Sequence, residues 1–395
     1  MKAGFCPDCG LPAWRHILNR LGEPTDRMLP VFNPPRRIED FSDYFLEKLF
    51  VALGLFRPRK DFAVADIPQR VFLFLKEMEK RGAAGYAFKT PWGWADFYKV
   101  VVGKKTFRFQ GLPTAPFESK YPSRLSDDKW LAKQHLKRSG FPVAEAQAFW
   151  FWQKKKALDF GQKLGFPLVV KPRAGSLSRH VSTDVRNLND LKKAVDWSLV
   201  YSPAFIVEKY LAETFVFRAT VVDFDFIAVH QGLPANVVGD GISSITKLIE
   251  IKNADPRRGP ADQKQFSFHP IVVDKTTEEL LNQKGYGLES ILRKDELIYL
   301  QKDSFLRLGG DIIETTAETH PENQKLFSDV ARHFDIRFVG IDFLAQDISL
   351  PWREQACAVL ELNSLPAFES HHFPVSGQPQ NVASALAELF FKYYV

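Results

Sequence analysis

Residues 359–366 read Val-Leu-Glu-Leu-Asn-Ser-Leu-Pro. Apolar residues alternate with Glu361 and Asn363, which is the period of a β-strand, so the carboxylate and the amide leave the same face. Upstream, residues 338–345 read Phe-Val-Gly-Ile-Asp-Phe-Leu-Ala, an apolar run in which Asp342 is costly to bury unless it is paired or binds a metal. Two such strands side by side would gather the oxygen ligands that Mg²⁺ accepts. In the alternative interpretation, Asp342 and Glu361 are ordinary charges at strand ends and Asn363 opens a turn.

The composition is that of a globular protein with more than one domain. The chain has 395 residues, of which 45% are hydrophobic, so we expect two or three domains or subdomains. A net charge of +6 favours anionic ligands such as nucleotides, but no dense basic run beyond residues 154–156 indicates a nucleic-acid partner. Neither a signal peptide nor a membrane-spanning stretch is visible, so we expect no membrane partner and a cytoplasmic location. A homo-oligomer is left open.

Three cysteines in a chain of this length argue against a disulfide scaffold and for a reducing compartment. Cys6 and Cys9 form a Cys-x-x-Cys pair, with His16 nearby. This set is a candidate zinc knuckle, although a complete structural site has four ligands. One hypothesis treats residues 1–67 as a metal-bound docking module for a partner protein.

Helical and strand patterns alternate along the chain, with hairpin-like runs among them, which indicates an α+β or mixed α/β class. Ser126 is the expected N-cap of a helix at 127–139 that carries two acids in its first turn. The other expected helices lie at 41–55, 71–81, 154–164 and 190–200. The expected strands lie at 97–102, 106–109, 166–172 and 204–211, with a pair within 215–229.

Two lysines stand at positions suited to phosphate. Lys129 opens a helix, and Lys171 ends a buried strand before residues 173–181. That loop contains Gly175 and Ser176 among hydroxyl and basic side chains, which suit phosphate oxygens. Lysines at such places are more often surface or snorkelling residues, which is the alternative.

A strand end at Glu208 carries further polar groups. Lys209 and Tyr210 follow it, and their backbone groups could face an adenine edge while Glu213 binds the ribose hydroxyls. The alternative is a plain sheet edge.

Arg218 falls on the polar face of the next strand. It could clamp an anionic reacting group, or it could pair with Asp223. The chain contains no Walker A sequence and no dinucleotide fingerprint, and residues 239–241, Gly-Asp-Gly, indicate a turn.

The order of these residues resembles the ATP-grasp superfamily. Lys129, Val-Lys-Pro at 170–172, Val-Glu-Lys-Tyr at 207–210, Asp342 and Glu-Leu-Asn at 361–363 follow one another as in that superfamily. More narrowly, several segments resemble the ligase module of cyanophycin synthetases and of bifunctional glutathione synthetases. These segments are residues 234–241, 249–259, 309–311, 320–323 and 340–342, and the resemblance covers residues 68–395.

The resemblance implies an ATP-grasp fold, in which two α+β subdomains clasp ATP. The subdomains would be the small one at 126–202 and the large one, with the metal site, at 203–395. A small α/β pre-ATP-grasp unit at 68–125 and an N-terminal extension at 1–67 would precede them. The implied activity is a carboxylate–amine ligase that phosphorylates an amino acid or peptide carboxylate and then lets an amine attack it.

The resemblance also implies the roles of the site residues. ATP and Mg²⁺ would be needed, with two magnesium ions, or Mn²⁺ in their place. By position, Arg218 and Lys171 would be catalytic, and Asp342, Glu361 and Asn363 would bind the metal. The nucleotide would be held by Lys129, Lys171, Gly175, Ser176, Glu208, Lys209, Tyr210 and Glu213.

The expected phosphate loop departs from the family pattern. Gly175 is kept, but Ser178 and His180 stand in later glycine positions. Their side chains could obstruct phosphate, or Arg179 and His180 could replace the backbone contacts. The alternative function is therefore a non-catalytic ATP-binding regulatory or scaffold protein. Arg307 stands where small hydroxyl residues are usual, which suggests a different substrate.

Overall fold

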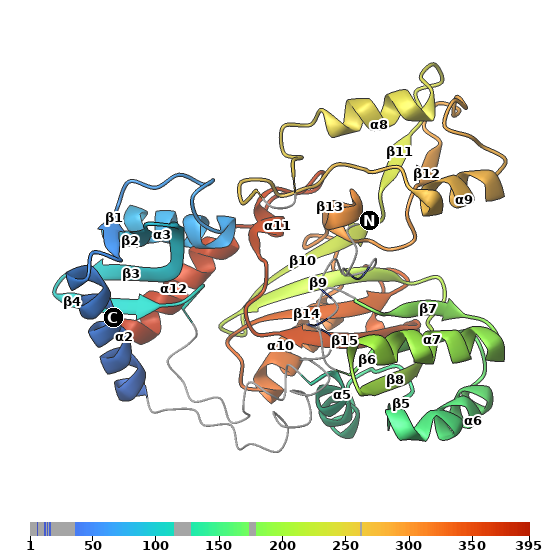
Figure 1. The fold of residues 1–395 in the computed structure, drawn as a ribbon, viewed down its shortest axis with the longest axis horizontal. Coiled ribbons are helices and arrows are strands. Elements are labelled where there is room, and N and C mark those ends of the chain that lie inside the picture. Colours follow the sequence, from blue (N-terminus) through green and yellow to red (C-terminus); the bar gives the residue numbers. More distant parts are fainter. Residues whose placement is uncertain are drawn as a thin grey trace.

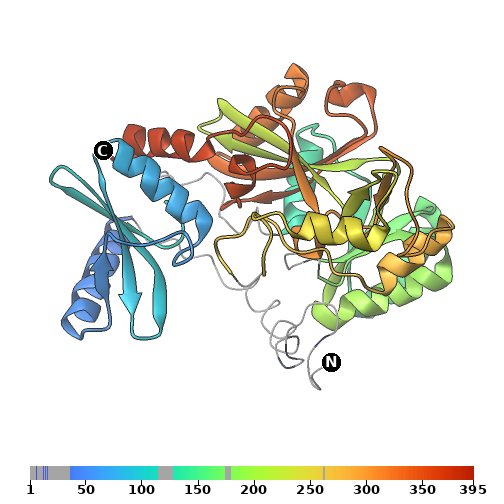
Figure 2. The same ribbon diagram turned by 90° about the horizontal axis from the view of Figure 1, so that it is seen from above.

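The computed structural model describes residues 36–113, 128–173, 179–260 and 263–395, together with Cys6, Pro12, Trp14 and His16. The described residues form four sheets that are covered by helices, so the class is α+β, as the patterns predict. Figures 1 and 2 both place the first unit of the chain at one end of the long axis. The sheet that carries β6 (Leu168–Pro172) and β7 (Ser182–Val185) lies at the other end, and the largest sheet lies between them.

The first unit is an antiparallel sheet in the order β1-β2-β3-β4. These strands are β1 (Arg57–Arg59), β2 (Ala84–Thr90), β3 (Gly93–Val102) and β4 (Lys105–Phe109). Three helices belong to it: α2 (Arg36–Ala52), α3 (Gln69–Lys80) and α12 (Val382–Tyr394). Figure 1 shows α12, the last helix of the chain, beside α3.

The spacing of the apolar residues in α3 explains how this unit forms its core. Val71, Phe74, Leu75 and Met78 are all buried on one face, at the spacing of an amphipathic helix. This face packs with α12 in one apolar core. We expected the N-terminal extension to end at residue 67, but β1, which precedes this position, pairs with β2, which follows it. In addition, Glu47 of α2 forms ion pairs with Lys99 of β3 and Arg108 of β4.

The largest sheet has five antiparallel strands in the order β13-β10-β9-β14-β15. They are β9 (Phe215–Val222), β10 (Phe226–Leu233), β13 (Asp311–Glu314), β14 (Phe338–Ala345) and β15 (Cys357–Asn363). One face, which includes Phe217 and Ile341, packs on Phe327 of α10 (Pro321–His333). Because side chains alternate along a strand, the residues between these, such as Arg218 and Asp342, lie on the opposite face.

A second antiparallel sheet has the order β5-β8-β6-β7. It consists of β5 (Ala146–Trp150), β6 (Leu168–Pro172), β7 (Ser182–Val185) and β8 (Ala204–Lys209). The helices α6 (Lys154–Leu164) and α7 (Leu188–Tyr201) pack on it. The short helix η1 (Phe151–Gln153) precedes α6.

The helix that carries Lys129 starts later than expected. It is α5 (Lys129–Arg138), and its N-cap is Asp128, whose Oδ1 accepts from the amides of Trp130 (3.0 Å) and Leu131 (3.1 Å). The expected cap, Ser126, lies outside the described residues. The prediction of two acids in the first turn is wrong, because Asp128 is the cap itself.

An α/β insertion lies between β10 and β13. It contains the antiparallel pair β11 (Asn236–Val238) and β12 (Leu297–Tyr299), with α8 (Ile245–Asn253) and α9 (Lys275–Gln283) around a small core. The remaining short elements are η2 (Leu306–Leu308), η3 (Trp352–Glu354) and α11 (Glu369–His372). None of the helices in the described part of the chain combines the length and the apolar character that a membrane span needs.

Candidate active site

A row of charged residues crosses the polar face of the five-stranded sheet. Asp342 of β14 is the register partner of Arg218 on β9 and of Glu361 on β15. Arg218 donates to both carboxylate oxygens of Asp342, from Nε and from Nη2, the latter at 2.9 Å from Oδ2. Asn363, two residues after Glu361, places its Nδ2 at 3.4 Å from Asp342 Oδ2. The structure therefore brings the three expected metal ligands and Arg218 together.

The alternative prediction, that Arg218 pairs with Asp223, is wrong. Asp223 lies in the turn after β9 and pairs with Arg337 (2.6 Å) and with Lys392. Arg218 and Asp342 are direct neighbours in register, so the sheet itself selects the pairing.

Lys129 reaches this row from α5. Its Nζ lies 3.1 Å from Glu361 Oε2. Burial raises the pKa of Asp342, and Glu361 adds to the rise while Arg218 opposes it. Burial also disfavours ionisation of Glu361, but Lys129, Asp342 and Arg218 together outweigh burial and lower the pKa of that carboxyl. Two adjacent carboxylates that resist joint ionisation, beside an amide, form a donor set that fits a hard divalent cation.

A second group of charges joins α5 to the smaller sheet. Lys171 of β6 and Lys133 of α5 each place Nζ 3.0 Å from Glu208 Oε2. All three side chains are buried. Burial would raise the pKa of Glu208, but Lys171 and Lys133 lower it below its ordinary value. Burial lowers the pKa of Lys133 to about 8, although Glu208 opposes this shift.

Helix α5 therefore connects the two groups. Lys129 and Lys133 are four residues apart, so they share one helix face. One lysine pairs with Glu361 on the large sheet and the other with Glu208 on the smaller sheet. The start of α5 is held in turn by Arg173, which follows β6 and donates to both oxygens of Asp128.

The segment expected to meet adenine is bound within the protein. The Lys209 amide donates to Glu145 O (2.8 Å), and the Tyr210 amide donates to Pro167 O (3.2 Å). Lys209 Nζ donates to the carbonyls of Gly165 (2.9 Å) and Phe166 (3.1 Å). These donors are therefore not available to an adenine edge in this structure.

An open depression of about 520 Å³ lies beside this segment. Tyr210 and Glu213 line it together with Asp184 and Arg186. Glu213 is exposed and adopts a φ of 56°. Burial raises the pKa of Tyr210, and Asp184 adds to this effect. The depression thus holds two of the residues expected to contact the nucleoside.

The expected phosphate loop is described in part. Gly175, Ser176 and Ser178 lie outside the described residues. His180 is 0% exposed, and its Nδ1 lies 3.1 Å from Trp197 O. The suggestion that His180 replaces a phosphate contact is therefore wrong, because its ring is buried against α7.

Sequence reasoning missed two features of the site. Lys133 was missed, although its position four residues after Lys129 on a helix is a usable signal. The second feature is a buried network on the same sheet face. His371 of α11 contacts Thr220 Oγ1 (2.9 Å) and Glu314 Oε2 (2.8 Å), and His230 lies 3.0 Å from Ser370 Oγ. No local pattern predicts these pairs, because each joins α11 to a strand that is distant in the sequence.

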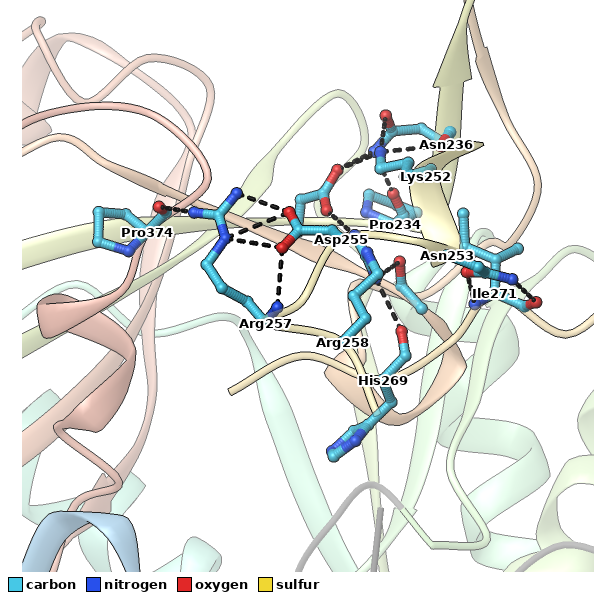
Figure 3. Close-up of polar contacts among 12 residues, drawn as sticks. Pro234, Asn236, Lys252, Asn253, Asp255, Arg257, Arg258, His269, Ile271 and Pro374 are labelled. Atoms are coloured by element: carbon cyan, nitrogen blue, oxygen red, sulfur yellow. Dashed lines mark hydrogen bonds and ion pairs between the residues drawn. The ribbon is translucent and has the colours of Figure 1, made fainter. Parts of the chain in front are cut away.

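The segments that carried the resemblance form a structural network. Figure 3 shows Lys252 directed at Asn236, whose backbone O and Oδ1 lie 2.9 and 2.8 Å from Nζ. Lys252 and the buried Arg258 also pair with the two oxygens of Asp311 at the start of β13. Arg257 binds Asp255 and the carbonyl of Pro374.

Two glycines of these segments allow close packing. A Cβ on Gly239 would lie 2.1 Å from Arg293 O, and a Cβ on Gly310 would lie 2.7 Å from Leu233 O. These segments therefore attach the α8 insertion to the large sheet.

The arrangement of the sheets defines the fold. The described residues have the ATP-grasp fold. The crystal structure of a bifunctional glutathione synthetase from Pasteurella multocida superposes with a TM-score of 0.64 over 83% of this chain and 44% of that chain, at 24% identity. No family model matches the sequence.

Two sets of relatives are similar in sequence, as the resemblance predicted. A cyanophycin synthetase from Synechocystis sp. is 36% identical over 271 residues, which are 68% of this chain and 30% of that protein. A bifunctional glutathione biosynthesis protein from Pasteurella multocida is 26% identical over 272 residues, which are 68% of this chain and 35% of that protein. The chain therefore matches about a third of the length of these relatives.

Proposed function

We propose that this protein is an ATP-dependent carboxylate–amine ligase. The γ-phosphoryl group of ATP is transferred to a carboxylate of an amino acid or peptide, which gives an acyl phosphate and ADP. An amine then attacks the acyl carbon, phosphate leaves, and an amide bond remains. The proposal is based on the row of Arg218, Asp342 and Glu361 on adjacent strands, in which Glu361 also pairs with Lys129.

The chain's own cations suit phosphoryl transfer. This reaction needs charge neutralisation and positioning more than covalent help from the protein. Lys129 pairs with Glu361 and Lys171 pairs with Glu208, and both lysines can neutralise phosphate oxygens. Arg218 uses two of its nitrogens on Asp342, which fixes the guanidinium beside the proposed metal ligands. We assign Arg218 to the charge that develops on the acyl phosphate.

We propose that Asp342, Glu361 and Asn363 bind Mg²⁺, with Mn²⁺ as a substitute and a second ion in the full site. Bound there, the ion would neutralise phosphate charge and orient the oxygens. A cation at Glu361 competes with Lys129 for the same carboxylate, so metal binding would release Lys129 toward the nucleotide. The nucleoside is assigned to the depression at Tyr210 and Glu213.

The domain division stays a proposal. From the sequence we expected a small subdomain at 126–202 and a large one at 203–395. Because β8 (Ala204–Lys209) belongs to the sheet of the small subdomain, we place the boundary after Lys209. Residues 68–125 are assigned to the unit that precedes them, in which β1 and α2, from residues 1–67, also take part.

The test is ADP release from Mg-ATP by the purified protein, against pooled amino acids and short acidic peptides. Mass spectrometry of the pools identifies the product. We expect stimulated ADP release together with a condensed mass. Glu354→Gln, at an exposed glutamate of η3, is the control and should keep full activity. Tight ATP binding without turnover in every pool would contradict the ligase and favour a non-catalytic nucleotide-binding protein.

A further inference from the structure

Three side chains from two distant parts of the chain meet in the interior. Cys6 and His16 come from the N-terminal segment, and His180 lies between β6 and β7. Their exposed fractions are 8%, 5% and 0%. The sulfur and one ring nitrogen from each histidine all lie within 4.8 Å of one another.

The spacing of the donor atoms matches a tetrahedral metal. Cys6 Sγ lies 3.5 Å from His180 Nε2. A zinc ion with Zn–S of about 2.3 Å and Zn–N of about 2.0–2.1 Å holds its sulfur and nitrogen ligands roughly 3.5 Å apart at the tetrahedral angle. The rings of His16 and His180 are nearly perpendicular, with centroids 5.1 Å apart, so both can direct a nitrogen to one point.

The surroundings of His180 favour ligation. Its Nδ1 lies 3.1 Å from the carbonyl oxygen of Trp197, which accepts the Nδ1 proton and leaves Nε2 as the atom with a lone pair toward Cys6. Metal-binding histidines commonly donate their second nitrogen to a carbonyl in this way, and the contact fixes the ring. The rings of Trp197 and Tyr201 from α7 pack against His180 at 4.4 and 5.4 Å and keep water away.

We propose that Cys6, His16 and His180 bind a structural zinc ion. One thiolate and two imidazoles are the soft and borderline donors that zinc prefers. The site differs from a knuckle confined to the N-terminal segment, because one ligand comes from the loop that follows Lys171. Cys9 lies outside the described residues.

The metal would connect the N-terminal segment to the end of the expected phosphate loop. His180 follows β6 by eight residues in sequence order and directly precedes the segment that leads into β7. A bound zinc would therefore fix the place where this loop returns to the sheet. This role is independent of the proposed ligase activity, and its readouts are metal content and stability.

The experiment measures zinc in the full chain after growth in zinc-supplemented medium and purification without chelator. We expect about one zinc per chain in the wild type. Cys6→Ser and His16→Ala should each lower zinc content at least about fivefold, because each removes one donor from a buried site. Cys357→Ser removes a cysteine elsewhere, on β15, and should keep the wild-type content.

Cobalt substitution gives a second, spectroscopic readout, and its measurement on the wild type requires no variant to fold. The wild type is stripped with a chelator and titrated with Co²⁺ alone. A thiolate-to-cobalt charge-transfer band should appear in the wild type and in Cys357→Ser, and it should be absent in Cys6→Ser. A wild type that holds no zinc and shows no such band overturns the proposal, as does a Cys6→Ser variant that binds zinc as tightly as the wild type.

Discussion

Glu361 illustrates how one side chain serves two states of the site. In the structure its carboxylate is held by Lys129 at 3.1 Å, and in the proposed complex the same oxygens bind magnesium. Glu361→Gln keeps the shape but removes the charge. We expect ADP formation to fall at least about 100-fold, with little change in melting temperature, because a metal ligand contributes to the reaction more than to the core.

The control for this variant is a metal titration. If the loss comes from the metal site, Glu361→Gln should need a higher Mg²⁺ concentration for half-maximal activity. Wild-type turnover and an unchanged Mg²⁺ requirement would contradict the metal assignment.

Lys171 and Lys133 form a matched pair for the second prediction. Both lie 3.0 Å from Glu208, but Lys133 also donates to Ala144 O (3.4 Å) and is more deeply buried. We expect Lys171→Ala to weaken ATP binding at least about tenfold, since a charge-assisted phosphate contact contributes about 1.5–3 kcal/mol. Lys133→Ala should lower stability with a smaller effect on ATP affinity.

Calorimetry with ATP measures both affinities, and urea unfolding measures both stabilities. Equal ATP affinity in the wild type and Lys171→Ala would contradict the proposal that Lys171 binds phosphate.

At the scale of elements, Glu77 joins two helices that are far apart in sequence. It accepts from Lys80 of α3 and from Arg81, the C-cap of α3, both at 2.7 Å, and from Asn381, the N-cap of α12, at 3.2 Å. Burial disfavours its charge, but Lys80 and Arg81 prevail and lower its pKa to about 2 from 4.5. The ionised group therefore adds stability above pH 4.5, and this stability is lost as the pH falls to about 2.

Glu77→Gln should remove that contribution. We expect the free energy of unfolding to fall by about 1–2 kcal/mol at pH 7, and the difference from the wild type to shrink between pH 4.5 and pH 2. Urea unfolding across this range measures it. Glu79→Gln, at a half-buried i,i+3 pair with Lys76 on the same helix, is the control and should change less. A difference that stays constant with pH would show that Glu77 acts by packing alone.

The elements also show what the sequence could predict. Helix α6 and strand β14 have the expected bounds, because their apolar periods are strong and Gly165 ends the helix. Strand β2 was missed, since Ala and Gly weaken its pattern. The predicted start of α5 was wrong because three consecutive residues are of types that cap helices, and the local sequence does not select one of them. These residues are Ser126, Asp127 and Asp128.

The order of residues along the chain was enough to predict that four residues belong to one site. These are Arg218, Asp342, Glu361 and Asn363. This order could not give the partners of these side chains, which depend on the register between strands. The contact of His180 with Cys6 could not be predicted from the sequence either, because it joins segments far apart along the chain.

At the scale of the molecule, the last helix completes the first unit. Phe390 of α12 is 1% exposed, and its ring lies 5.9 Å from that of Phe74 on α3 and 5.1 Å from that of Phe107 on β4. Figure 2 shows α12 reaching from the large sheet to this unit. The unit at one end of the long axis thus depends on residues that follow the whole site in sequence.

Phe390→Ala tests this dependence. Removing a buried ring costs about 3–5 kcal/mol, and here the loss falls on one unit. We therefore expect calorimetry to show a separate, earlier unfolding transition, with hydrogen exchange accelerated in α3 and β2–β4 and unchanged in β9, β14 and β15. Phe41→Ala, at a ring that is 68% exposed on α2, should leave both measurements near wild type. Simultaneous acceleration of exchange in the large sheet would mean that the two parts unfold as one cooperative body, since α12 would then stabilise the site as well as the unit it closes.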